Sequence, residues 1–270
     1  MLLREVSYAR ASSVGEAVEI LSRHEDARPL AGGQTLINVM KARVASPEVL
    51  VDLGGIEDLR GIRGDADGSL ELGAMATYTE VMLSPEVAER RPVLAEVASV
   101  IADVQVRNQG TIGGNVCAND PTNHFPPLFA ALGATFTIAG ADGERTVPAD
   151  EFFLGVFMTA VQPGEVLTRV TVPPVNGAGD AFESLPIGRD GTGIVNVAAT
   201  VTDGSARIAV GCVGAVPAVV TSAVDEESVR AAVRGAGLDP PSDVHASAEY
   251  RRHLAEVLAV RAVQRAGGGG

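Results

Sequence analysis

The chain has 270 residues, a length that accommodates one large core or two smaller ones. Its composition, 46% hydrophobic and 20% charged, is that of a globular protein and excludes an intrinsically disordered chain. With 34 acidic against 21 basic residues the net charge is −13, which argues against nucleic acid or an anionic membrane as the main partner. Only one base, Lys41, is a lysine, so lysine side chains are not expected to hold a bound phosphate.

Several kinds of site and segment are absent from the sequence. No apolar run approaches the roughly 20 residues of a membrane-spanning helix, and the first residues lack the features of a secretory signal. The two cysteines, Cys117 and Cys212, are too few for a disulfide framework or an iron–sulfur cluster. The four histidines do not show HExxH spacing, so no metal site is expected. These features favour a reducing cytoplasm.

Short helices and strands alternate in the first two thirds of the chain. Ser13 and Glu16 have the spacing of a capping box, and the apolar residues that follow keep a helical period, which predicts a helix. The remaining pattern predicts strands at 29–31, 49–53, 69–75, 134–139, 144–147 and 166–172, and helices at 36–44, 92–102 and 126–132. A segment rich in glycine and asparagine, 107–124, has no clear period.

The last third has a different character. The Pro- and Gly-rich stretch 173–179 is the best candidate linker. Beyond it the sequence predicts strands at 194–202 and 206–213 and helices at 226–234 and 247–265. This part is therefore expected to be a sheet with helices packed on one side. The four glycines at 267–270 are predicted to form a disordered tail.

Two glycine segments are candidates for binding an anionic ligand. The first, Ala31-Gly32-Gly33-Gln34-Thr35, lies between a predicted strand and a predicted helix, and the second is Thr111-Ile112-Gly113-Gly114-Asn115. Paired glycines let a ligand approach the backbone closely, and N–H groups at the start of a helix attract anions. If the two segments face each other, they can hold a pyrophosphate without lysine. Each alone is also compatible with an ordinary turn, and neither matches GxGxxG or the P-loop pattern.

These segments resemble those of a known protein family. Residues 31–36, AGGQTL, look like the family's AGGxSL loop, and residues 107–115, RNQGTIGGN, look like its RNxGTIGGN loop. The family is the FAD-binding medium subunit of molybdenum hydroxylases, the xanthine dehydrogenase and aerobic carbon monoxide dehydrogenase type. The likeness continues, in chain order, at 120–121, 164–167, 194–198, 211–217 and 247–254.

The resemblance implies an α+β fold in two domains. Residues 1–175 would form an FAD-binding domain of the vanillyl-alcohol-oxidase (PCMH) type, made of two subdomains that split near 55–60. Residues 176–266 would form a smaller C-terminal α+β domain of the carbon monoxide dehydrogenase flavoprotein type, a sheet covered by helices.

The resemblance also implies an oxidoreductase subunit that carries noncovalent FAD and passes electrons to an external acceptor. A large partner subunit would hold molybdopterin and a small one the [2Fe–2S] clusters, and by analogy with the family the assembly would be a dimer of heterotrimers. The chain itself would have no catalytic residue for the substrate. Two alternatives are a self-sufficient FAD-dependent oxidoreductase of the same fold, and an assembly subunit whose FAD site has decayed.

The resemblance assigns cofactor contacts to particular residues. The glycine segments would hold the pyrophosphate and the ribityl side of FAD, and Leu167 would pack near the flavin or adenine. His124 stands where many relatives have a second acid, and it would either hydrogen-bond the cofactor or pack beside Phe125 or a partner. Many relatives also have a lysine near the flavin, whereas 182–185 has none. The full set of expected contacts is Ala31, Gly32, Gly33, Gln34, Thr35, Thr111, Ile112, Gly113, Gly114, Asn115, Asp120, His124 and Leu167.

Overall fold

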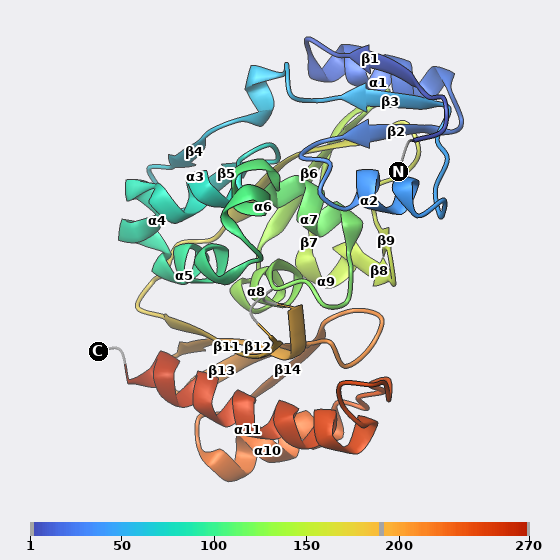
Figure 1. The fold of residues 1–270 in the computed structure, drawn as a ribbon. Helices are drawn as coiled ribbons and strands as arrows, with labels where there is room; N and C mark the ends of the chain where they lie inside the picture. Colours follow the sequence, from blue (N-terminus) through green and yellow to red (C-terminus); the bar gives the residue numbers. More distant parts are fainter. Residues whose placement is uncertain (1–2, 189–191, 269–270) are drawn as a thin grey trace.

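Three principal sheets, each with its own helices, follow one another along the chain in the computed structural model, which describes residues 3–188 and 192–268. The N-terminal sheet lies at one end of the molecule, a five-stranded sheet with most of the helices lies in the middle, and the C-terminal sheet with its two helices lies at the other end (Figure 1). The mixed α+β fold that the sequence predicts is confirmed.

The N-terminal unit is a small parallel sheet in the order β1-β3-β2. Its elements are β1 (Ser7–Arg10), α1 (Val14–Arg23), β2 (Ala27–Leu30), α2 (Leu36–Lys41) and β3 (Val49–Asp52). Helix α1 begins as predicted, because the Ser13 side chain accepts a hydrogen bond from the Glu16 N–H. Its apolar face packs into a core to which Met75 and Val166 of the middle unit also contribute. The two units are therefore packed against each other rather than merely joined in sequence.

The middle unit is an antiparallel sheet in the order β4-β5-β10-β6-β7. Its strands are β4 (Ile62–Gly64), β5 (Leu70–Gly73), β6 (Thr135–Gly140), β7 (Gly143–Pro148) and β10 (Val166–Val172), with the 3-10 turn η1 (Glu57–Leu59) before them. The helices are α3 (Tyr78–Leu83), α4 (Pro85–Arg90), α5 (Pro92–Val100), α6 (Val104–Gln109), α7 (Ile112–Ala118), α8 (Phe125–Leu132) and α9 (Ala149–Phe152). A two-stranded hairpin, β8 (Phe153–Gly155) and β9 (Met158–Thr159), follows α9.

The second glycine segment is helical rather than a loop, which corrects the interpretation of 107–124 as irregular. Residues 112–118 form α7, and Thr111 caps it by accepting a hydrogen bond from the Gly114 N–H. Gly113 is needed because a Cβ there would stand 2.7 Å from the Ala74 Cβ. Helices α3, α4 and α6 were also missed, since six-residue helices are too short to show a clear apolar period.

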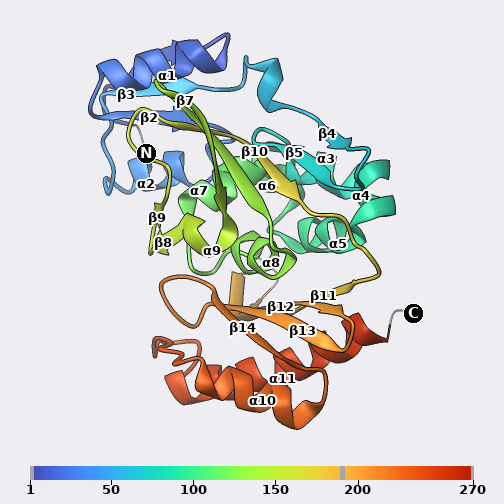
Figure 2. The ribbon, with the colours of Figure 1, turned by 180° about the vertical axis from the view of Figure 1, so that it is seen from behind.

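The C-terminal unit is an antiparallel sheet in sequence order, β11 (Gly179–Ile187), β12 (Thr192–Thr202), β13 (Ser205–Gly211) and β14 (Ala218–Ala223). Helices α10 (Glu226–Gly235) and α11 (Ala248–Gly267) cover one face, as predicted, and α8 of the middle unit packs on the other (Figures 1 and 2). Strands β11 and β14 were not predicted. The predicted tail at 267–270 overlaps the end of α11 at Gly267, and residues 269–270 lie outside the described part.

A buried ion pair fixes the connection between the middle and C-terminal units. The Arg91 guanidinium contacts the Asp180 carboxylate, and both side chains are almost fully buried. Arg91 also donates to the Pro173 and Pro174 carbonyls, at 2.9 and 3.1 Å from Nη2. These bonds hold the predicted linker against the start of α5. Breaking them would leave buried charged and polar groups unpaired, which costs free energy of folding.

Candidate functional site

The structure brings the two glycine segments into direct contact. A Cβ on Gly32 would stand 1.8 Å from the Gln109 carbonyl oxygen, and a Cβ on Gly114 would stand 3.6 Å from that of Ala31. Only a hydrogen atom fits at Gly32, so the first segment can lie this close to the residues that precede α7. The expectation that the two segments face each other agrees with this contact.

The first segment presents a row of unpaired backbone donors. Within the described residues, the N–H groups of Gly32, Gly33, Gln34, Thr35 and Leu36 have no hydrogen-bond acceptor. Gly33 has φ +70°, a conformation that turns the backbone here, and Thr35 makes no side-chain cap bond at the start of α2. The Thr35 hydroxyl is exposed. Consecutive free N–H groups and a hydroxyl are the donors that a phosphate group accepts from.

The second segment does not present its N–H groups in the same way. The N–H of Ile112 donates to the Ala76 carbonyl at 2.9 Å, that of Gly113 to the Ala74 carbonyl at 2.8 Å, and that of Gly114 to the Thr111 hydroxyl at 3.0 Å. The expectation that N–H groups at the start of a helix attract an anion therefore does not hold for Ile112, Gly113 and Gly114, whose donors are already used. Its donors anchor α7 to the chain before α3, and Gly114 is its most accessible residue.

Tyr78 supports the second segment from behind. Its N–H donates to the Gly110 carbonyl at 3.1 Å, its ring lies against Gly110, and its hydroxyl accepts from Asn115 Nδ2 at 2.9 Å. Burial raises the pKa of Tyr78 to about 12, so the phenol stays protonated at ordinary pH. The Asn115 Oδ1 is buried without a partner, an orphaned polar atom beside the glycine contact.

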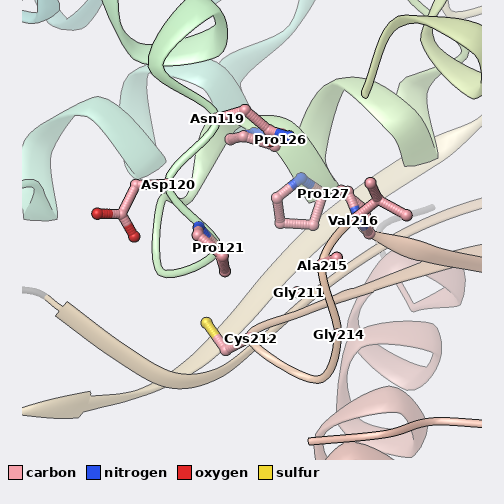
Figure 3. A pocket seen from close by; sticks show the side chains of 11 residues that line it. Asn119, Asp120, Pro121, Pro126, Pro127, Gly211, Cys212, Gly214, Ala215 and Val216 are labelled. Atoms are coloured by element: carbon pink, nitrogen blue, oxygen red, sulfur yellow. The ribbon is translucent and has the colours of Figure 1, made fainter. Parts of the chain in front are cut away.

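Asp120 lies at the other end of α7, on the segment that leads to α8. Its Oδ1 accepts from the N–H and hydroxyl of Thr122, at 2.9 and 2.8 Å, and this closes a turn. Its second oxygen accepts no hydrogen bond from the residues that the structure describes. Figure 3 shows the carboxylate pointing away from the rings of Pro126 and Pro127, which line a small cavity against the loop that contains Cys212.

His124 is buried at the contact with the C-terminal sheet. Its ring stacks on Phe182 of β11 with 5.4 Å between centroids and an interplanar angle of 27°. Burial lowers the pKa of His124 to about 4, so the ring is neutral at ordinary pH. Of the two expectations for this residue, the structure favours packing, although its partner is Phe182 rather than Phe125.

Acid should therefore destabilise the protein through His124. The folded-state pKa lies below the unfolded value of about 6.5, so the unfolded chain binds the proton more readily and stability falls as the pH drops from 6.5 towards 4. The loss approaches ~3 kcal/mol at pH 4, from about 1.4 kcal/mol per pKa unit. The variant His124→Phe keeps an aromatic ring on Phe182 but cannot titrate, so it should lose less stability over this range. Urea unfolding at several pH values measures the difference.

The control for this experiment is His253→Gln, because His253 is exposed on α11. This variant should keep the wild-type pH dependence. If His124→Phe and the wild type lose stability in parallel between pH 6.5 and 4, His124 is not the responsible group.

The other expected positions have structural partners. Leu167 is 4% exposed and lies in β10, paired with Ile138, within the main core. Arg107, just before the second glycine segment, donates to the Ile101 and Ala102 carbonyls at 2.9 and 2.7 Å. The site residues thus separate into the glycine contact, the Asp120–His124 segment beside the C-terminal sheet, and Leu167 in the interior.

Sequence reasoning missed three asparagines that organise this region. The Asn119 amide donates to the Gly155 and Met158 carbonyls at 2.7 and 3.1 Å, and Asn123 Nδ2 donates to the Asn115 carbonyl at 3.1 Å. Asn196 of β12 donates to the carbonyls of the same segment. The density of asparagine at 115–123 was the available signal, since this residue satisfies irregular backbone.

Two other kinds of site, a membrane span and a metal centre, are not found in the part of the chain that the structure describes. Of the helices in residues 3–188 and 192–268, none combines the length and apolar character that a membrane span requires. Over the same residues, no group of three or more His, Cys, Asp and Glu side chains is arranged to hold a metal ion.

Comparisons with known proteins identify the family. Residues 4–175 match the FAD-binding domain in molybdopterin dehydrogenase, and residues 180–266 match the carbon monoxide dehydrogenase flavoprotein C-terminal domain. The chain belongs to the FAD-binding medium subunits of the molybdenum hydroxylases. This confirms the resemblance stated from the glycine segments, and it makes the chain an oxidoreductase subunit with an FAD-binding domain.

Individual members of the family are similar along their whole length. The carbon monoxide dehydrogenase medium chain of Afipia carboxidovorans is 39% identical, with 98% of each chain covered. The nicotine 6-hydroxylase medium subunit of Paenarthrobacter nicotinovorans is 33% identical, with 99% of each covered. In the structure of reconstituted CO dehydrogenase from Oligotropha carboxidovorans, a chain 38% identical and fully covered superposes with a TM-score of 0.93.

Proposed function

We propose that this chain is the FAD-carrying electron-transfer subunit of a three-subunit molybdenum hydroxylase. Electrons would arrive from [2Fe–2S] clusters of a small partner subunit and leave to an external acceptor, and a large partner subunit would hold the molybdopterin. Full-length similarity to a carbon monoxide dehydrogenase medium chain is the observation that carries this proposal. Bound FAD supplies the redox chemistry, since it exchanges electrons both singly and in pairs.

The glycine contact fits the pyrophosphate of FAD. The free N–H groups from Gly32 to Leu36 and the Thr35 hydroxyl supply donors without a positively charged side chain. We propose that residues 31–35 supply the hydrogen-bond donors and that residues 111–115 pack behind them. Because Gly32 has no side chain, the two segments can stay in contact. Gly114 leaves space at the accessible end of the second segment.

The remaining site residues have different roles in this proposal. The free oxygen of Asp120 would accept a hydrogen bond from a hydroxyl or N–H group of the cofactor. Leu167 and His124 would act from behind the cofactor by packing, because both are buried in protein contacts. Ser184 and its neighbours bring no positive charge to this side, so the reduced flavin would lack the cation that many relatives place there.

The domain division follows the same family pattern. The FAD-binding domain would comprise 1–175, with its two subdomains separated near 55–60, and the C-terminal domain 176–266. The gap between β3, which ends at Asp52, and β4, which begins at Ile62, supports the first division. The start of β11 at Gly179 supports the second. Both cysteines are unbridged, which is compatible with a reducing cytoplasm.

The substrate is expected to be set by the large partner subunit. Medium subunits with similar full-length identity belong to enzymes named for carbon monoxide and for nicotine, so similarity at this level does not select a substrate. A dimer of heterotrimers remains the proposed assembly.

Purification tests this function directly. The chain expressed alone should bind FAD noncovalently, with visible flavin absorption that is lost on denaturation, and should oxidise no organic substrate. Isolated from its native host, it should copurify with a larger molybdenum-containing subunit and a smaller iron–sulfur subunit. A single chain that turns over a substrate by itself would instead support the self-sufficient flavoenzyme, and a chain that takes up no FAD would contradict both.

A further inference from the structure

One polar side chain of the C-terminal sheet reaches the Asp120 segment. Asn196 of β12 is fully buried, and its Nδ2 donates to the Thr122 and Asn123 carbonyls at 3.3 and 3.4 Å. Its Oδ1 accepts from the Ser184 hydroxyl at 2.6 Å. Every hydrogen-bonding atom of the side chain is therefore used, two of the three bonds crossing between the domains.

The orientation of this amide is fixed by its partners. Two backbone carbonyls, which only accept, lie on one side of Asn196, so the NH2 group must face them. The Ser184 hydroxyl then donates to the remaining oxygen. Ser184 and Asn196 are cross-strand neighbours, and Gly193 packs so closely that a Cβ there would stand 2.2 Å from Asn196 Oδ1. The amide has one available position.

The sheet face around Asn196 is otherwise apolar at its centre. Phe182, Ala198 and Ala209 share a core with α8, and His124 stacks on Phe182. The other polar contact of β12 on this face, Thr200 with Asp180, which pairs with Arg91, lies four residues along the strand from Asn196 and holds the linker rather than the Asp120 segment. Of these two polar residues of β12, Asn196 is therefore the one that contacts the Asp120 segment.

The held segment connects directly to α7. Asn123, whose carbonyl accepts from Asn196, donates through Nδ2 to the Asn115 carbonyl at 3.1 Å. Asp120 lies between these anchored points, in a turn closed by Thr122. A shift of the Thr122 and Asn123 carbonyls therefore changes where the Asp120 carboxylate stands.

We propose that Asn196 is a positioning residue for FAD, which holds the 119–124 segment so that the Asp120 carboxylate meets the cofactor. The inference rests on the proposed function and extends it to the C-terminal domain. That domain then does more than pack on the FAD-binding domain, because it sets the position of a negative charge that would meet the cofactor. A negative charge there disfavours the reduced flavin, so its displacement makes reduction easier.

The test compares two substitutions on the same face of β12 in the full chain loaded with FAD. Asn196→Leu keeps the side-chain size but removes the bonds to the Asp120 segment, whereas Thr200→Val removes a bond to Asp180. Asn196→Leu should bind FAD about tenfold more weakly and have a more positive flavin midpoint potential. Thr200→Val should lower the melting temperature while both flavin properties stay unchanged.

A double-mutant cycle tests the route through Asp120. Asp120→Asn should also make the potential more positive, and Asn196→Leu added to it should change the potential no further. Additive shifts would show that Asn196 does not act through Asp120. If Asn196→Leu does not fold, Ser184→Ala, which frees the amide to rotate, should give a smaller change in the same direction.

The outcomes separate the inference from the proposed function. Wild-type affinity and potential in Asn196→Leu, or equal flavin changes in Thr200→Val, would overturn the inference alone. A wild-type chain that takes up no FAD would overturn the proposed function and the inference with it.

Discussion

Gly114→Asp should abolish FAD binding, with a loss of at least about 100-fold in affinity. A Cβ at Gly114 would stand 2.9 Å from the Thr111 hydroxyl and 3.6 Å from the Ala31 Cβ, so the new side chain enters the contact between the glycine segments. Its carboxylate would lie beside the pyrophosphate, where like charges repel strongly because water is partly excluded. A 100-fold loss corresponds to about 3 kcal/mol. Visible flavin absorption and titration with added FAD measure it.

The matched control is Gly114→Asn, which adds nearly the same volume without the charge. It should weaken FAD binding by about tenfold, from the steric part alone. Both variants should fold, because Gly114 is half-buried and has no left-handed backbone conformation. Equal affinities for the Asp and Asn variants would show that charge is not the cause, and wild-type affinity in Gly114→Asp would remove this residue from the site.

Elements with a clear period were predictable from the sequence. Strand β10 has the predicted bounds, because it is rich in β-branched residues and ends at Pro173-Pro174. Helix α11 was recognised from its apolar face, although it ends two residues later than predicted. By contrast, β11 was not predicted, since Gly179 and Pro186 are unusual in a strand, and the pairing with β12 that defines it shifts register between Leu185 and Pro186.

The candidate site could be located from the sequence but not oriented. Motif spacing identified both glycine segments, and the contact at Gly32 agrees with their expected proximity. The N–H groups at the start of α7 are not free, because they donate to the carbonyls of Ala74 and Ala76, nearly 40 residues earlier in the chain. The free N–H groups therefore lie on the first segment. The role of Asn196 depends in the same way on long-range packing. No local pattern contains this information.

The acidic composition has a consistent explanation at the glycine contact. The chain has a single lysine, and Arg107 beside the second segment donates to backbone carbonyls, so the donors available to a phosphate here are the five consecutive free N–H groups and the Thr35 hydroxyl. Such donors are fixed by the fold and need no counter-charge, so they work within a protein of net charge −13. They also depend on backbone position, and a small displacement of either segment changes all of them together.

Gly32→Ala tests that dependence, and Gly235→Ala is its control. Gly235 ends α10, and a Cβ there would have no atom within 4 Å, so this variant should leave FAD affinity unchanged and keep or slightly raise stability. Both substitutions add a single methyl group to a glycine outside the left-handed region. The two variants therefore differ in whether the new methyl group overlaps with other atoms.

At Gly32 the added Cβ would stand 1.8 Å from the Gln109 carbonyl oxygen and 2.6 Å from its carbon. Both atoms belong to the backbone, so no rotamer change relieves the overlap, and the two segments must separate by roughly 1 Å or more. We expect unfolding free energy to fall by about 2 kcal/mol and FAD affinity to fall by about 100-fold. Urea unfolding and FAD titration measure the two effects. Reduced stability with wild-type affinity would show that the first segment binds FAD without the second, and the pyrophosphate would then be held by Gly32–Leu36 alone.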